Sequence, residues 1–164
     1  CEVPAVNILG HEGEGGRVLM SGLDFERTVL SGGPVGIMQA CMDIVVPYVH
    51  DRKQFGQAIG SFQSLGHRQA THFMNMELSR SCVEAALAAV DTDGEDLAQL
   101  ASLAKSLVGD FLFDMSNDMI QMHGGIAMTD EFDAGLFLKR ARAVETLLGN
   151  RAFHKRRYIS FSGI

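Results

Sequence analysis

Glu26 is the first residue in this sequence whose surroundings suggest a chemical role. It lies in the stretch SGLDFERTVL, residues 21–30. Its neighbours three and four positions away are all apolar or glycine: Gly22, Leu23, Val29 and Leu30. Such neighbours share a face on a helix, so the pattern predicts a carboxylate on an apolar surface. Burial disfavours the charged form of a carboxyl group, which suits a general base. The alternative is a structural carboxylate near a helix start, held by the helix dipole or a distant arginine.

A second candidate site is DRKQFGQAIGSFQ, residues 51–63. Arg52 and Lys53 come shortly before the pair Phe55–Gly56. An arginine beside an aromatic ring can hold a phosphate and stack on a flat ring. The alternative is a loop with solvated charges, in which Phe55 covers the end of a helical bundle.

A third candidate site is QMHGGIAMTDEF, residues 121–132. The paired glycines Gly124 and Gly125 allow a left-handed helix cap and also let a ligand approach the backbone. Gln121 and His123 could hydrogen-bond to such a ligand, and the alternative is a plain helix stop. The six histidines show no pair four positions apart, so no metal site is predicted.

Helices must position these residues. Apolar residues spaced by three and four predict helices over residues 17–47, 61–90 and 95–122, with shorter ones around 131–143 and from 150 onward. Pro47 is expected to kink or end the first helix. The apolar stripe expected on that helix is Leu19, Leu23, Glu26, Leu30, Gly33, Ile37, Cys41, Ile44 and Tyr48. The pattern predicts an all-α, antiparallel up-down helical bundle over residues 17–164 with very little strand. Residues 1–16, with β-branched residues, a proline and HEGEGG, predict a short extended N-terminal arm.

Composition limits the class of protein. A chain of 164 residues that is 46% hydrophobic is expected to form one globular domain. Its net charge of -6 argues against non-specific nucleic-acid binding, and the basic run Lys155–Arg157 is expected to be a solvated helix end. The sequence is read as having no apolar run of transmembrane length, so no membrane span is predicted. Three distant cysteines, Cys1, Cys41 and Cys82, predict no disulfide framework and a reducing compartment. Because residue 1 is not methionine, we expect a processed product or a piece of something longer.

In order and spacing, these segments resemble the C-terminal helical domain of acyl-CoA dehydrogenases. GRVLMSGLDFERTVLSGGPVGIMQACMD is similar to the first helix of that domain. DRKQFGQAIGSFQ matches the family's Arg-x-x-Phe-Gly…Phe-Gln segment, IQMHGGIAMTDEF its Gln-x-x-Gly-Gly segment, and LFLKRAR resembles the helix that follows. CEVPAVNILGHEGEG resembles the end of the preceding β-domain, so the arm would be a remnant of it. The resemblance covers nearly the whole chain.

The resemblance also implies where the catalytic base lies. Most of the family carries a glutamate in a Glu-Gly-Thr motif near the C-terminus, whereas the equivalent stretch here is LLGNRA, with Leu148 in its place. A second branch, which includes the isovaleryl-CoA dehydrogenases, carries the base on the first helix of this domain. SGLDFER is very similar to that branch, which implies that Glu26 is the base. Glu145, close to the missing site, is the alternative.

The family's chemistry is the α,β-dehydrogenation of an acyl-CoA thioester, with FAD accepting the hydride. By the resemblance, the residues that contact FAD, commonly that of a neighbouring subunit, are Arg52, Gln54, Phe55, Gln121, Gly124 and Gly125. Asp24 and Arg27 would lie near the acyl-CoA. The implied partners are a second copy of the chain, in a homodimer or homotetramer, and an electron-transfer flavoprotein. The implied location is the bacterial cytoplasm or the mitochondrial matrix. A non-catalytic oligomerisation module derived from the family and an acyl-CoA oxidase relative are the alternatives.

Three departures from the family pattern concern the nucleotide. Ala127 stands where the family often has a third glycine, so its methyl group is expected to crowd the nucleotide. Asn150 and Ala152 replace the usual threonine and glutamine, which affects contacts on the adenine side.

Family members have an N-terminal helical domain and a β-domain ahead of this one, and the flavin lies between the β-domain and the bundle. We therefore expect this chain alone to supply Glu26 and one wall of the site.

Overall fold

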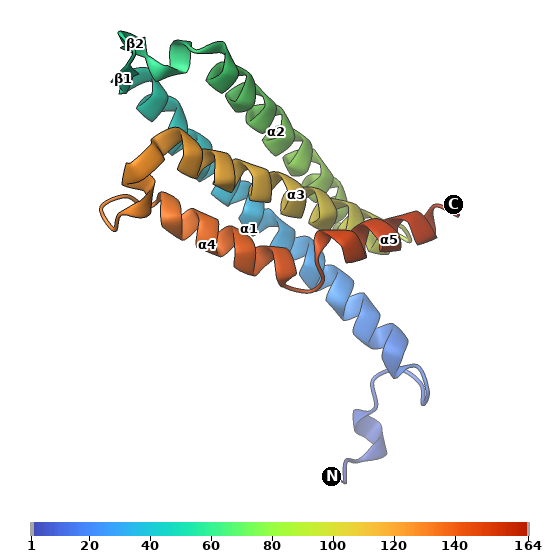
Figure 1. Cartoon of the computed structure of the whole chain (residues 1–164). Coiled ribbons are helices and arrows are strands. Elements are labelled where there is room, and N and C mark those ends of the chain that lie inside the picture. The colour runs from blue at the N-terminus through green and yellow to red at the C-terminus, as the bar shows by residue number, and fades with distance from the viewer. Residues whose placement is uncertain (1, 164) are drawn as a thin grey trace.

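The computed structural model describes residues 2–163, so Cys1 and Ile164 lie outside the described residues. Within that range the chain forms five α-helices: α1 (Gly15–Asp51), α2 (Gln63–Asp91), α3 (Leu97–His123), α4 (Ala134–Thr146) and α5 (Arg151–Phe161). The shorter elements are η1 (Ala5–Asn7), β1 (Lys53–Gln54), β2 (Gln57–Ala58), η2 (Ile59–Ser61) and η3 (Gly124–Met128). Figure 1 shows α1 to α4 running up and down beside one another, with α5 turning away at one end. The predicted all-α antiparallel bundle is confirmed.

Helix α3 is the centre of the bundle, because it contacts each of the other four α-helices of the described chain. Most of the core comes from apolar residues of three helices, and α4 adds the small residues Ala134 and Ala141. The larger contributors are Met38, Cys41, Val45 and Val49 of α1, Met76 and Val83 of α2, and Val108, Leu112, Met115 and Met119 of α3. Methionine is unbranched and fills irregular gaps, which suits a core that several helices share. Burial raises the pKa of the Cys41 thiol to about 12, so this cysteine is an inert core residue.

Helix α1 differs from its prediction in phase. Its buried residues are Asp24, Arg27, Thr28, Ser31, Pro34, Val35, Met38, Cys41, Val45 and Val49. The predicted stripe shares only Cys41 with this set and is therefore wrong by about one residue. The reason is that polar residues can be buried on this face, because their hydroxyl groups hydrogen-bond to the backbone of the same helix. Thr28 Oγ1 donates to Asp24 O at 2.9 Å, and Ser31 Oγ donates to Arg27 O at 2.7 Å. Hydrophobic periodicity does not detect such residues.

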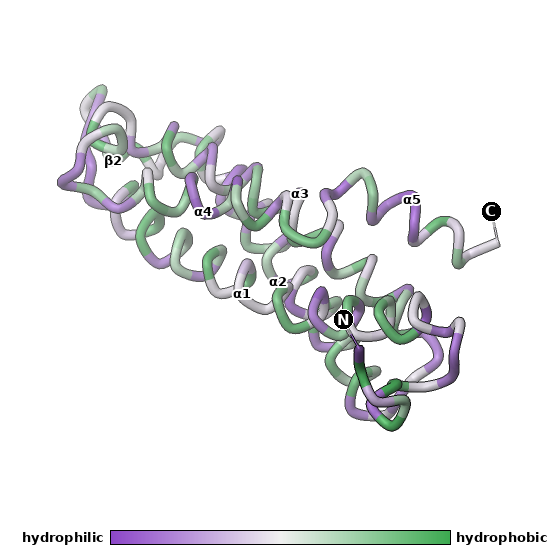
Figure 2. Tube along the Cα trace, turned by 90° about the horizontal axis from the view of Figure 1, so that it is seen from below, coloured by the Kyte–Doolittle hydropathy of each residue, from purple (hydrophilic) through white to green (hydrophobic). Residues whose placement is uncertain are grey.

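Two further expectations for α1 are corrected. Pro47 does not end the helix, which continues to Asp51 and ends where Arg52 turns to extended backbone. By length and composition, moreover, α1 is a helix that could cross a membrane, so the expectation that no apolar run reaches that length is wrong for it. It nevertheless packs against α2 and α3 and carries a buried aspartate and arginine, as a core helix does. Figure 2 shows hydrophilic and hydrophobic residues mixed along the helices.

The arm before α1 is exposed from residue 2 to residue 13. It contains the single turn η1 and no strand among the described residues, and Figure 1 shows it leading away from the bundle. The first turns of α1 also lie beyond the other helices, and Leu19 is 62% exposed there. Among the described residues, Asp24 is the first along the sequence to be buried.

Candidate active site

Glu26 lies on α1 with its side chain exposed. The neighbours expected from the spacing are exposed or half-buried, with Val29 50% exposed, and the adjacent Phe25 is 51% exposed. The burial that the sequence pattern suggested is therefore wrong for this chain. Glu26 stands on an uncovered apolar face of α1, and it makes no ion pair with any residue between 2 and 163.

Asp24 and Arg27 lie on the opposite, inner side of the same helical turn. Asp24 is 4% exposed and Arg27 is 5% exposed. Arg27 Nη1 donates to Asp24 Oδ1 at 2.9 Å, and both terminal nitrogens of Arg157 on α5 donate to the Asp24 carboxylate at 2.6 Å. Arg157 Nη1 also donates to Ser102 Oγ at 2.9 Å and to Ala98 O at 3.1 Å on α3. The network joins α1, α3 and α5 directly behind Glu26.

Arg27 also connects the two positions at which the resemblance expects a base. Its Nε donates to Leu148 O at 3.2 Å, a contact between residues 121 positions apart in the chain. Leu148 therefore lies beside the turn of α1 that carries Glu26. The alternative base, Glu145, is half-buried, and its Oε1 lies 3.5 Å from Arg151 Nε in an ion pair. Of the two carboxylates, Glu26 is the one left unpaired within the described chain.

The second predicted segment forms a tight hairpin at the end of α1. The Arg52 N–H donates to Tyr48 O at 2.8 Å, and β1 pairs with β2 in the register Gln54 to Gln57. The two residues of the turn, Phe55 and Gly56, both have positive φ, at 55° and 81°. Positive φ at both central residues is typical of a type I′ turn. The first central position of such a turn favours asparagine, aspartate or glycine, and phenylalanine is unusual there. Phe55 is 91% exposed, so a strained backbone holds an aromatic ring out in solvent.

An open groove of about 800 Å³ lies beside this hairpin, and it is lined by both Phe55 and Gln121. The structure thus brings together residues from the second and third predicted segments. Tyr48 Oη donates to His123 O at 3.2 Å, which ties the end of α1 to the end of α3. Gly124 follows at φ 66°, a conformation that favours glycine, and a Cβ there or at Gly125 would meet nothing within 4 Å. The backbone at this end of the bundle is open to approach.

Two residues of the third segment have structural roles instead. His123 is buried, its Nδ1 lies 2.8 Å from Met119 O, and its ring packs against those of Tyr48 and Phe132. Burial lowers the pKa of His123, while the hydrogen bond to Met119 O acts to raise it. Ala127 is 1% exposed and belongs to the core cluster, so its methyl group packs within the bundle.

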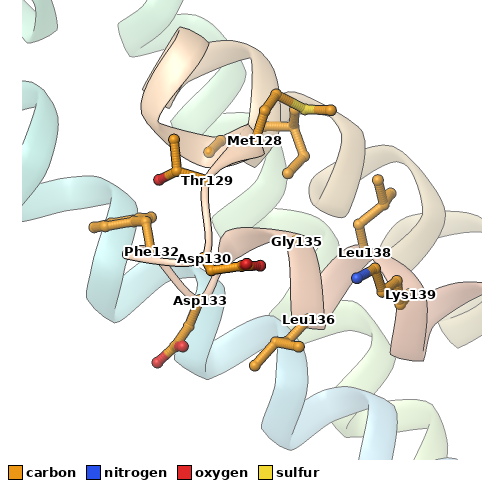
Figure 3. A pocket seen from close by; sticks show the side chains of 11 residues that line it. Met128, Thr129, Asp130, Phe132, Asp133, Gly135, Leu136, Leu138 and Lys139 are labelled. Atoms are coloured by element: carbon orange, nitrogen blue, oxygen red, sulfur yellow. The ribbon is translucent and has the colours of Figure 1, made fainter.

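Sequence reasoning missed several residues. Arg157 belongs to a basic run expected to be solvated, yet its side chain is only 12% exposed. Its partner Asp24 lies 133 positions away, so no local pattern announces the pair. A separate hollow of about 230 Å³ between η3 and α4 was not predicted either (Figure 3). Met128, Phe132 and Leu136 line it, and it contains none of the predicted site residues.

Comparisons with known proteins identify the family and the fold of the chain. Residues 13–160 match the family described as acyl-CoA dehydrogenase, C-terminal domain. The chain is 43% identical over 152 residues to the mitochondrial 2-methylacyl-CoA dehydrogenase of Solanum tuberosum, covering 91% of this chain and 36% of that protein. It is 41% identical over 145 residues to the mitochondrial isovaleryl-CoA dehydrogenase of Pongo abelii, covering 88% of this chain and 34% of that protein.

A solved structure, that of butyryl-CoA dehydrogenase from Megasphaera elsdenii, is similar with a TM-score of 0.90 and 26% identity. The similarity covers 99% of this chain and 42% of that one. The chain spans about a third of the length of the curated relatives named above. It belongs to the acyl-CoA dehydrogenase family, and it carries the C-terminal helical domain of that family.

Proposed function

We propose that this chain is the C-terminal domain of an FAD-dependent acyl-CoA dehydrogenase in which Glu26 is the catalytic base. The observation that carries the proposal is the hydrogen bond from Arg27 to Leu148 O. It places the α1 turn with Glu26 beside position 148, where this chain has no carboxylate. A base on this turn of α1 and a base at position 148 would lie close to the same substrate site, and Glu26 is the unpaired carboxylate there.

Glu26 would remove the α-proton of an acyl-CoA thioester. A carboxylate becomes a stronger base when water is removed from it, since desolvation disfavours its charged form. The exposed apolar rim of Phe25 and Val29 provides a surface that a preceding β-domain can cover, and covering it would dehydrate Glu26. Exposure in this chain and burial in the assembled enzyme are therefore compatible.

The hairpin and the end of α3 fit FAD, which when bound accepts the hydride from the β-carbon. Members of this family are FAD-dependent. Arg52 supplies a cation for phosphate, Phe55 an exposed flat ring, and Gln121 a polar side chain in the same groove. Gln54 lies on the hairpin, and Gly124 and Gly125 leave the backbone open.

The exposure of Phe55 favours contact with the flavin of a second copy. The ring is 91% exposed, and among the described residues its aromatic neighbour is Phe62, whose ring centroid lies 6.1 Å away. Members of the family are oligomeric. A homodimer or homotetramer would place this ring against a neighbouring nucleotide, and an electron-transfer flavoprotein would receive the electrons.

Asp24 and Arg27 would lie beside the acyl-CoA site and position the helical turn of the base. Their charged groups are already paired inside the bundle, so they act through the placement of α1. The relatives named 2-methylacyl-CoA and isovaleryl-CoA dehydrogenase suggest a short branched acyl-CoA as substrate. The relatives include mitochondrial and mycobacterial proteins, which suggests the mitochondrial matrix or the bacterial cytoplasm.

The test is turnover of an intact enzyme that joins this chain to the family's N-terminal helical domain and β-domain. Glu26→Gln should abolish dehydrogenation of isovaleryl-CoA while FAD stays bound, and Glu145→Gln, the matched control, should remain active. Equal activity in both variants would reject the proposal. The rival is an oligomerisation module, favoured by exposed Phe73, Met74 and Leu78 on α2. It predicts that the intact protein is oligomeric but has no acyl-CoA dehydrogenase activity.

A further inference from the structure

The turn between α4 and α5 has an unusual backbone. Leu148 has a φ of 58° and Gly149 a φ of 109°. A leucine is rarely found in this left-handed region and stays there only where its surroundings over-determine it. A Cβ at position 149 would lie 2.6 Å from Phe153 Cδ1 and 2.8 Å from His154 Nε2. The turn is therefore fixed in a tight shape by the residues packed on it.

Side chains from three helices contact carbonyl groups of this turn and of the last turn of α4. The last carbonyls of a helix have no donor within the helix, so those of α4 need partners from elsewhere. From α3, Lys105 Nζ donates to Val144 O at 2.9 Å and lies 3.5 Å from Glu145 O. From α5, His154 Nε2 lies 3.1 Å from Leu148 O, the carbonyl that also accepts from Arg27 of α1.

The two donors are buried, and their surroundings set their protonation. Lys105 is 2% exposed and His154 is fully buried. Burial lowers the pKa of His154 to about 4, the bond to Leu148 O acts to raise it, and Arg27, Lys105 and Arg157 lower it. The ring is therefore neutral at pH 7. Because Leu148 O can only accept, the single ring proton lies on Nε2.

We propose that Lys105 and His154, together with Arg27, clamp the α4–α5 turn against α1 and thereby position the turn of α1 that carries Glu26. Arg27 is the link, since it follows Glu26 directly and bonds to the clamped carbonyl. Lys105 and His154 are positioning residues that act through Leu148 and Arg27, and they touch no reacting atom. The inference deepens the proposed function and rests on it.

The test compares matched variants of the intact enzyme. In His154→Leu the Nε2 donor is lost, whereas in His154→Gln a side-chain N–H can still reach Leu148 O. Lys105→Gln removes the charge and shortens the reach to Val144 O. Val83→Ala, in the α2 core, is the control for a general loss of stability. Hydrogen exchange at residues 147–150 and the separate kcat and KM for isovaleryl-CoA are measured in each.

We expect faster exchange at residues 147–150 and a fall in kcat of about 10- to 100-fold in His154→Leu and Lys105→Gln, with KM little changed. His154→Gln should recover kcat, and Val83→Ala should keep it. A kcat in both His154→Leu and Lys105→Gln equal to that of Val83→Ala would overturn the clamp. If His154→Leu does not fold, Lys105→Gln alone decides between these results. Activity in Glu26→Gln would instead reject the proposed function, so the two failures are distinguishable.

Discussion

Acid should destabilise this domain through His154. The perturbation is a fall in pH from 7 to 4. The ordinary pKa of histidine is 6.5, and burial lowers that of His154 to about 4 in the folded chain. Between these values the unfolded chain binds a proton that the folded chain does not. Stability is therefore greatest above pH 6.5 and falls as the pH decreases toward 4.

The size of the effect follows from the two pKa values. A tenfold difference in proton affinity is worth about 1.4 kcal/mol, so a pKa of about 4 against 6.5 corresponds to about 3 kcal/mol. Burial also lowers the pKa of His123, so acid should decrease the unfolding free energy through this residue as well. Because carboxylates also titrate in this range, the contribution of His154 must be isolated by comparison with a variant.

The assay is urea unfolding of the purified chain at several pH values, for the native sequence and for His154→Gln. Glutamine does not titrate, while His123 and the carboxylates remain in both proteins. When the pH falls from 7 to 4, the unfolding free energy of the native chain should decrease by about 3 kcal/mol more than that of His154→Gln. Parallel curves over this range would refute a buried, neutral His154.

Three further substitutions test other parts of the structure. Asp24→Asn leaves the buried guanidinium group of Arg27 and the half-buried one of Arg157 without their carboxylate, so it should cost about 3–5 kcal/mol in urea unfolding. A loss below about 1 kcal/mol would contradict the network. Gly60→Ala should cost about 1–3 kcal/mol because its Cβ would lie 3.0 Å from a backbone oxygen of α1, whereas Gly66→Ala, with open space, should be neutral or stabilising. Phe55→Asn suits the first position of the turn and should raise stability by about 1 kcal/mol, yet weaken FAD binding in the intact enzyme, as a flavin titration would show.

The existence of the helices could be predicted from the sequence, because long amphipathic segments separated by turns leave little choice. Helix α2 begins at Gln63 and α3 ends at His123, each close to its predicted bound. The phase of α1 could not be predicted. That helix is apolar or small on most sides, and its buried face contains Thr28 and Ser31, which bond to their own backbone.

The candidate site could be predicted only in part. Phe55 and Gln121 were expected to share a ligand, and the structure places both at one groove. Lys105, His154 and Arg157 could not be predicted, because their partners are backbone carbonyls or a carboxylate on other helices. Arg157 and Asp24, for example, lie 133 positions apart. Such contacts are determined by the packing of the bundle and leave no spacing in the sequence.

The most direct test of the central claim, that Glu26 is the base, measures proton removal by itself. The intact enzyme is mixed in D₂O with an acyl-CoA that has sulfur in place of its β-carbon and so has no hydride to lose. Exchange of the α-protons for deuterium is then followed by mass spectrometry. We expect exchange with the native enzyme and with Glu145→Gln, and a rate lower by at least about 100-fold with Glu26→Gln. Exchange that continues unchanged in Glu26→Gln would contradict the account, and loss of exchange in Glu145→Gln alone would assign the base to Glu145.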